Sequence, residues 1–115
     1  MTLNNLSIGD WGEEFAARFL QRKGYQILQR KWRSAAGEVD LVAKNSNAIV
    51  LCEVKTRSTS NFGHPTEAVS VERIARLQRA ADLVVNPNHL PVRIDVISIQ
   101  LQPVLICEHF EGVYS

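Results

Sequence analysis

The stretch AIVLCEVK at residues 48–55 decides the fold. Its apolar first part, residues 48–52, is typical of a strand in the middle of a sheet with both faces covered. Because side chains alternate across a strand, one face carries a single row of four residues: Ile49, Leu51, Glu53 and Lys55. A carboxylate and an ammonium group therefore prolong a buried apolar row.

Two explanations of Glu53 and Lys55 follow from this strand alone. Removing a carboxylate from water costs several kcal/mol, so a buried Glu53 needs a cation, hydrogen bonds or a cleft. Alternatively, the strand runs out into solvent, where Glu53 and Lys55 form a surface pair worth about 0 to 1 kcal/mol. Both explanations remain open at this point.

The preceding strand, predicted over residues 38–43, favours the first explanation. It carries Asp40, and a neighbouring strand brings that second carboxylate within reach of Glu53. Two carboxylates, with a backbone carbonyl such as that of Val54, form an all-oxygen site suited to Mg²⁺ or Mn²⁺. Such an ion lowers the pKa of bound water, and Lys55 would orient that water or neutralise developing charge. The predicted reaction is phosphodiester hydrolysis.

The other elements place this strand in an α/β fold. Apolar residues at spacings of three and four predict helices over residues 8–23 and 67–85, and alternation predicts strands over 25–33 and 92–99. Residues 104–107 are a candidate short fifth strand. A helical crossover implies a parallel neighbour, hence a mixed sheet flanked by helices. With 45% hydrophobic residues, the 115-residue chain is expected to form one domain over residues 1–115, with its core at about residues 9–99.

Charge distribution matters more than net charge here. A formal charge of +1 gives little long-range attraction for a polyanion. Six of the thirteen cations, however, lie between Arg18 and Arg33 with no acid among them. We expect Lys31 and Arg33 from this stretch to contact phosphates, together with Arg57, which lies two residues after Lys55. Trp32 lies in the same stretch and is as consistent with a core position as with base stacking.

Several classes of protein are not favoured. Two distant cysteines fit neither a disulfide framework nor a zinc site. The N-terminal residues lack a basic start followed by an apolar stretch, and no run approaches the roughly 20 apolar residues that span a bilayer. We therefore expect a cytoplasmic protein without membrane contact. The three histidines lack metal-ligand spacing and are not predicted general bases: His64, His89 and His109.

The short motifs, taken in order, resemble a known family. They are GDWGE at 9–13, KGY at 23–25, WR at 32–33, GEVDL at 37–41, EVKTR at 53–57, FG at 62–63 and RIDV at 93–96. Two carboxylates followed by a lysine resemble the PD-(D/E)XK nuclease superfamily. The full series, from about residue 9 to residue 99, resembles the YraN-like family of small bacterial proteins, which are similar to Holliday-junction resolvases.

This resemblance implies a restriction-endonuclease-like αβββαβ core. It implies catalytic positions for Asp40, Glu53 and Lys55, with Glu13 as the acidic residue on the first helix. Glu13 lies at the edge of the apolar stripe and can face the metal, although glutamates at a helix start also interact favourably with the helix dipole. The resemblance alone suggests branched DNA as the substrate and a homodimer as the active form.

One position departs from the family pattern. Arg73 stands where relatives usually carry lysine, and arginine keeps the charge but not the point-like geometry. Arg73 and Arg76 share a helical face and either contact phosphate or are simply solvated.

Three hypotheses follow. The first is a metal-dependent endonuclease acting on DNA. The second is a non-catalytic nucleic-acid-binding module that keeps the fold and the acidic pocket but assists another protein. The third is a structural or protein-interaction domain, in which Asp40, Glu53 and Lys55 form a satisfied ion-pair cluster.

Overall fold

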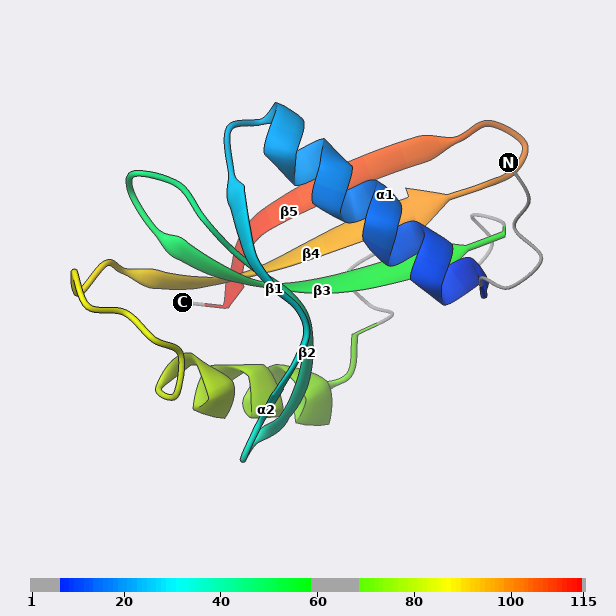
Figure 1. Ribbon diagram of the computed structural model, residues 1–115. Coiled ribbons are helices and arrows are strands. Elements are labelled where there is room, and N and C mark those ends of the chain that lie inside the picture. Colours follow the sequence, from blue (N-terminus) through cyan, green and yellow to red (C-terminus); the bar gives the residue numbers. More distant parts are fainter. Residues whose placement is uncertain (1–6, 59–68, 115) are drawn as a thin grey trace.

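A five-stranded mixed sheet lies between two helices (Figure 1). The structure is a computed structural model that describes residues 7–58 and 69–114. Its elements are α1 (Ile8–Arg22), β1 (Gln26–Ser34), β2 (Gly37–Lys44), β3 (Ile49–Arg57), α2 (Val71–Ala81), β4 (Val92–Gln100) and β5 (Ile106–Tyr114). This order confirms the predicted α/β class and contains the αβββαβ core.

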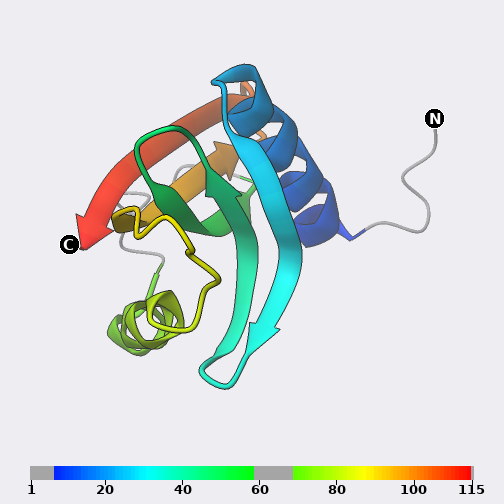
Figure 2. The same cartoon turned by 60° about the vertical axis from the view of Figure 1, so that its left-hand side comes forward.

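The strands lie in the sheet in chain order, from β1 to β5. Only the β3–β4 pair is parallel, and the other three pairs are antiparallel. The connection from β3 to β4 carries α2 across one face of the sheet, while α1 covers the other face (Figures 1 and 2). The prediction that β3 lies in mid-sheet with both faces covered is confirmed.

Each face of β3 contributes to a separate core. Val50, Cys52 and Val54 pack with residues of α1, including the fully buried Leu20. Ile49 and Leu51 pack on the other face with three buried residues of α2, which are Ile74, Leu77 and Ala80. Continued alternation puts Glu53 and Lys55 on the α2 face. The row predicted from the sequence is therefore present.

Local interactions fix where the two helices begin and how closely they pack. The side chain of Ser7 accepts a hydrogen bond from the Asp10 N–H at 3.0 Å, and Ser70 accepts one from the Arg73 N–H at 3.1 Å. Gly12 lets α1 approach β3, because a Cβ atom at this position would lie 1.8 Å from Thr56 Oγ1. The second glycine of the GDWGE motif thus lies where the start of α1 packs closely against β3.

Two predicted boundaries are wrong. The second helix is shorter than predicted, because Ser70 caps it and it ends at Ala81; residues 67 and 68 lie outside the described part of the chain. The fifth strand is longer than the predicted 104–107, because it pairs along β4 from residue 106 onwards despite its polar residues. Within residues 7–58 and 69–114, neither helix has the length and apolar run that a membrane span requires.

Candidate functional site

The site begins where β2 and β3 separate. Their ladder ends at the pair Leu41 and Cys52, but β3 continues to Arg57 along β4. Beyond that point the Val54 N–H has no β2 backbone partner and instead donates to Asp40 Oδ2 at 2.8 Å. Where the two strands separate, the Asp40 carboxylate therefore contacts the backbone of β3, one residue from Glu53.

Glu53 is buried, with 5% of its surface exposed, and its charge partner comes from α2. Its Oε1 accepts hydrogen bonds from Arg73 Nε at 3.0 Å and Arg73 Nη2 at 2.9 Å. The same Nη2 lies 3.9 Å from Asp40 Oδ1. Asp40 and Glu53 therefore converge, as the sequence predicted, and a single guanidinium lies against both.

The electrostatics show that this pair is short of positive charge. Burial, and then the nearby charge of Glu53, raise the pKa of Asp40 to about 6. The Val54 N–H and the Arg73 guanidinium oppose that rise without cancelling it. Burial is the largest single influence and would lower the pKa of Arg73, but the hydrogen bond to Glu53 and the nearby acidic charges together raise it. The site would hold additional positive charge favourably.

A cavity of about 330 Å³ opens beside the pair on the α2 face. Its lining combines one carboxylate with three cations and the start of α2: Glu53, Lys55, Val69, Ser70, Arg73 and Arg76. A helix N-terminus and clustered cations favour an anion. Lys55 is thus placed beside Glu53 in a cavity whose charges suit a phosphate.

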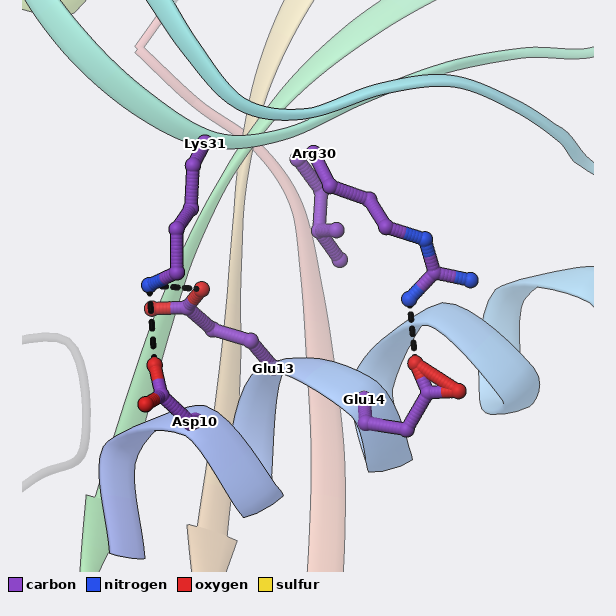
Figure 3. A pocket seen from close by; sticks show the side chains of 6 residues that line it. Asp10, Glu13, Glu14, Arg30 and Lys31 are labelled. Carbon is purple, nitrogen blue, oxygen red and sulfur yellow. Dashed lines mark hydrogen bonds and ion pairs between the residues drawn. The ribbon is translucent and has the colours of Figure 1, made fainter. Parts of the chain in front are cut away.

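Glu13 lies in a different cavity, of about 510 Å³, between α1 and β1 (Figure 3). Lys31 Nζ bridges Asp10 Oδ1 and Glu13 Oε1 at 2.9 Å each, and Arg30 pairs with Glu14. Burial raises the pKa of Glu13, and the charge of Asp40 adds to this rise, which Lys31 opposes. Glu13 is therefore within electrostatic reach of Asp40, but the structure does not bring it into the cavity of Glu53 and Lys55.

The cations predicted to contact phosphates occupy three different environments. Nε and Nη1 of Arg57 are buried and have no hydrogen-bond partner in the described structure. Arg33 is 86% exposed, with Glu38 at 3.7 Å. Lys31 is held by Asp10 and Glu13, whose hydrogen bonds raise its pKa. Of these three, Arg57 is the one with buried donors that find no partner among the described residues.

The donor chemistry fits a magnesium ion only in part. No three His, Cys, Asp or Glu side chains in residues 7–58 and 69–114 are grouped so as to hold a metal. Mg²⁺, however, is usually bound through one or two carboxylates, with waters and substrate phosphates as the remaining ligands. Asp40 and Glu53 supply such a pair, and the carbonyl of Val54 stays a predicted ligand.

Comparison with known proteins identifies the family. The profile of the Uncharacterised protein family UPF0102 matches residues 12–99. The chain belongs to this family. It is 44% identical to a UPF0102 protein of Roseiflexus castenholzii over 105 residues, covering 88% of this chain and 85% of that one. It is 38% identical to a UPF0102 protein of Streptomyces griseus over 113 residues, covering 93% and 95% of the two chains. The predicted YraN-like membership is confirmed.

Sequence reasoning missed two contacts of this UPF0102 chain. The first is the pairing of Arg73 with Glu53, which depends on how α2 docks and has no local signal. The second concerns His109, which lies in β5 with its side chain 2% exposed. Its Nε2 lies 2.6 Å from Asp95 Oδ2, and its Nδ1 lies 2.7 Å from Lys23 Nζ. The RIDV motif, with an aspartate inside an apolar strand, was the available signal. His64 lies outside the described residues.

Proposed function

We propose that this protein is a metal-dependent endonuclease that hydrolyses phosphodiester bonds of DNA in the cytoplasm. One observation carries the proposal: the partly buried Asp40 and the buried Glu53 lie together against a single guanidinium. Removing two carboxylates from water against so little positive charge is costly, and a divalent cation would relieve that cost. Lys55 and the adjoining cationic cavity supply the place for a phosphate.

In the proposed mechanism, Asp40 and Glu53 would hold Mg²⁺ or Mn²⁺. When bound, the ion would supply Lewis-acid stabilisation of the phosphate and a water of lowered pKa. The Val54 N–H fixes the orientation of Asp40 through its 2.8 Å hydrogen bond. Lys55 lies on the same strand face as Glu53 and would neutralise charge that develops on the scissile phosphate. Arg76 would hold the phosphate in the cavity that it shares with Lys55.

Arg57 would extend the contact along the nucleic acid. It lies two residues beyond Lys55 on the same strand, so it follows Lys55 on one face at a distance of about 6.6 Å along β3. Its buried Nε and Nη1 find no acceptor among residues 7–58 and 69–114, and a neighbouring phosphate would provide one once the side chain turns outward. We further propose branched DNA as the substrate and a homodimer as the active form, on the strength of the resolvase resemblance.

The direct test is cleavage of labelled single-stranded, duplex and four-way DNA with Mg²⁺ or Mn²⁺. We expect Asp40→Asn and Glu53→Gln to lower the cleavage rate at least about 100-fold. Glu38→Gln is the matched control, since Glu38 lies on the same strand as Asp40 but pairs with the exposed Arg33. Wild-type protein that binds Mn²⁺ but cleaves none of the substrates would contradict an endonuclease.

A non-catalytic accessory module is the second candidate. The observation that favours it is the guanidinium of Arg73, which already gives Glu53 a cation without any metal. Such a module would bind DNA equally well in wild type, Asp40→Asn and Glu53→Gln. A loss of DNA affinity in Asp40→Asn only when the metal is present would favour the nuclease instead.

A further inference from the structure

Arg73 lies on the boundary between the carboxylate pair and the cationic cavity. Its guanidinium contacts Glu53 on one side, and its side chain lines the same cavity as Lys55 and Arg76 on the other. The side chain is 17% exposed, so it is neither locked in the core nor free in solvent. Its backbone is fixed by the Ser70 cap, so the side chain can move while α2 stays in place.

A metal ion bound through Glu53 Oε1 would compete with this guanidinium for that oxygen. Mg²⁺ binds carboxylate oxygens at about 2.0–2.1 Å. Arg73 already places two nitrogens at 2.9 and 3.0 Å from Glu53 Oε1. A divalent ion at that oxygen would face a second cation at close range with little water between them, and the two repel. Arg73 must leave Glu53 for the ion to bind there.

We propose that Arg73 is a positioning residue that exchanges between two partners, Glu53 in the metal-free protein and the substrate phosphate in the metal-bound protein. The inference rests on the proposed function of the carboxylate pair. The displaced guanidinium needs a new anion, and among the described residues the cavity that it lines offers only Glu53, which the metal would then occupy, beside the cations Lys55 and Arg76. Arginine presents a planar fork of donors that matches two phosphate oxygens, which lysine cannot do.

The exchange couples the metal site to the phosphate site. When a metal ion binds Glu53, Arg73 is free to bind the phosphate. When a phosphate binds Arg73, Glu53 Oε1 becomes free to bind the metal ion. Linkage requires the two effects to be equal, so each ligand raises the affinity for the other by the same factor. A residue that only stabilised the fold would produce no such coupling.

The first test measures Mn²⁺ affinity by calorimetry without nucleic acid. Arg73→Gln removes the competing charge and should tighten Mn²⁺ binding by about tenfold. Arg76→Gln is the matched control, because Arg76 lines the same cavity while Arg73 is the cation that forms the ion pair with Glu53 in the described part of the chain. It should leave Mn²⁺ affinity unchanged.

The second test measures the affinity for a labelled single-stranded oligonucleotide, first with a chelator and then with Ca²⁺. Arg73→Gln should leave the affinity unchanged without metal, because Arg73 is then held by Glu53. With Ca²⁺ it should weaken binding by about tenfold, while Arg76→Gln should weaken binding under both conditions.

The outcomes separate this inference from the proposed function. Equal Mn²⁺ affinity in wild type and Arg73→Gln overturns the exchange but leaves the carboxylate pair as a metal site. An absence of Mn²⁺ binding in wild type and in Arg73→Gln alike overturns both. If Arg73→Gln does not fold, Arg73→Lys takes its place: its single ammonium holds Glu53 less firmly, so tighter Mn²⁺ binding supports the exchange, and wild-type affinity overturns it.

Discussion

Asp95 and Asp40 lie on the two strands that flank β3, the first fully buried and the second with a 13%-exposed side chain, and their surroundings differ. Asp95 is fully buried and accepts from Arg93 through Nε and Nη2, from the Gly112 N–H, and is 2.6 Å from His109 Nε2. Asp40 accepts from the Val54 N–H and shares Arg73 with Glu53 at 3.9 Å. One carboxylate is surrounded by donors, and the other shares one guanidinium with a second carboxylate.

The pKa shifts of the two aspartates have opposite directions. Burial alone would raise the pKa of Asp95, but hydrogen bonds from His109, Arg93 and Gly112 outweigh burial and lower it. Burial and Glu53 raise the pKa of Asp40 to about 6. Asp95 therefore connects β4 to β5 as a structural group, whereas the Asp40 pair has a charge deficit of the kind found at functional sites.

The largest expected effect comes from removing the charge of Asp95. Asp95→Asn leaves Arg93 and the His109 contact without their anionic partner, so we expect unfolding free energy to fall by roughly 3 to 5 kcal/mol in urea denaturation. Mn²⁺ affinity should not change. A loss of unfolding free energy below about 1 kcal/mol would contradict the structural role that separates Asp95 from Asp40.

The pH dependence of that loss sharpens the same comparison. The pKa of Asp95 is depressed in the folded state, so its stabilising contribution is complete above its ordinary value of 3.8. It is lost as pH falls through the lower folded value. Denaturation curves of wild type and Asp95→Asn should therefore differ at neutral pH and converge in strong acid.

Asp40→Asn should change the free energy of unfolding in the opposite direction, so that the variant is more stable than wild type. Because the folded pKa is raised from 3.8 to about 6, ionisation of Asp40 opposes folding, and stability is lost as pH rises through this window. In chelator, Asp40→Asn should be more stable than wild type near neutral pH by roughly 2 to 3 kcal/mol. The advantage should vanish near the lower end of the window. An advantage that grows towards acid pH would contradict the assignment.

Gly12 tests the packing of α1, away from both aspartates. Gly12→Ala would place a methyl group 1.8 Å from Thr56 Oγ1, so we expect a loss of roughly 1 to 3 kcal/mol. Thr56 Oγ1 has no hydrogen-bond partner in the described structure, so Thr56→Ala should restore most of the stability in the double variant. Additive losses in thermal unfolding would show that the two residues do not meet.

Arg57 should give the smallest effect. Arg57→Ala is expected to weaken oligonucleotide binding by roughly fivefold at fixed salt, since one phosphate contact is lost. Arg33→Ala is a control, because the 86%-exposed Arg33 is near Glu38 and should contribute less. Equal effects of the two variants would contradict the proposal that Arg57 contacts a phosphate.

The sequence predicted what depends on local periodicity. Strand alternation placed Glu53 and Lys55 on one face, and strand order placed Asp40 beside them. The partner of Glu53 could not be predicted, because the position of Arg73 depends on the docking of α2 against the sheet. The pairing of Glu13 with Lys31 could not be predicted either, because the left-handed backbone at Lys31 (φ 49°) interrupts the alternation of side chains along β1. Long-range pairing also decided the length of β5.

The most direct test of the central claim is a crystal structure of the protein soaked in Mn²⁺, with the anomalous signal of the ion measured. We expect a peak bound by Asp40 and Glu53, with the Arg73 guanidinium moved away from Glu53 towards Lys55 and Arg76. A saturating soak that leaves Arg73 on Glu53, with no anomalous peak at the two carboxylates, would contradict the claim.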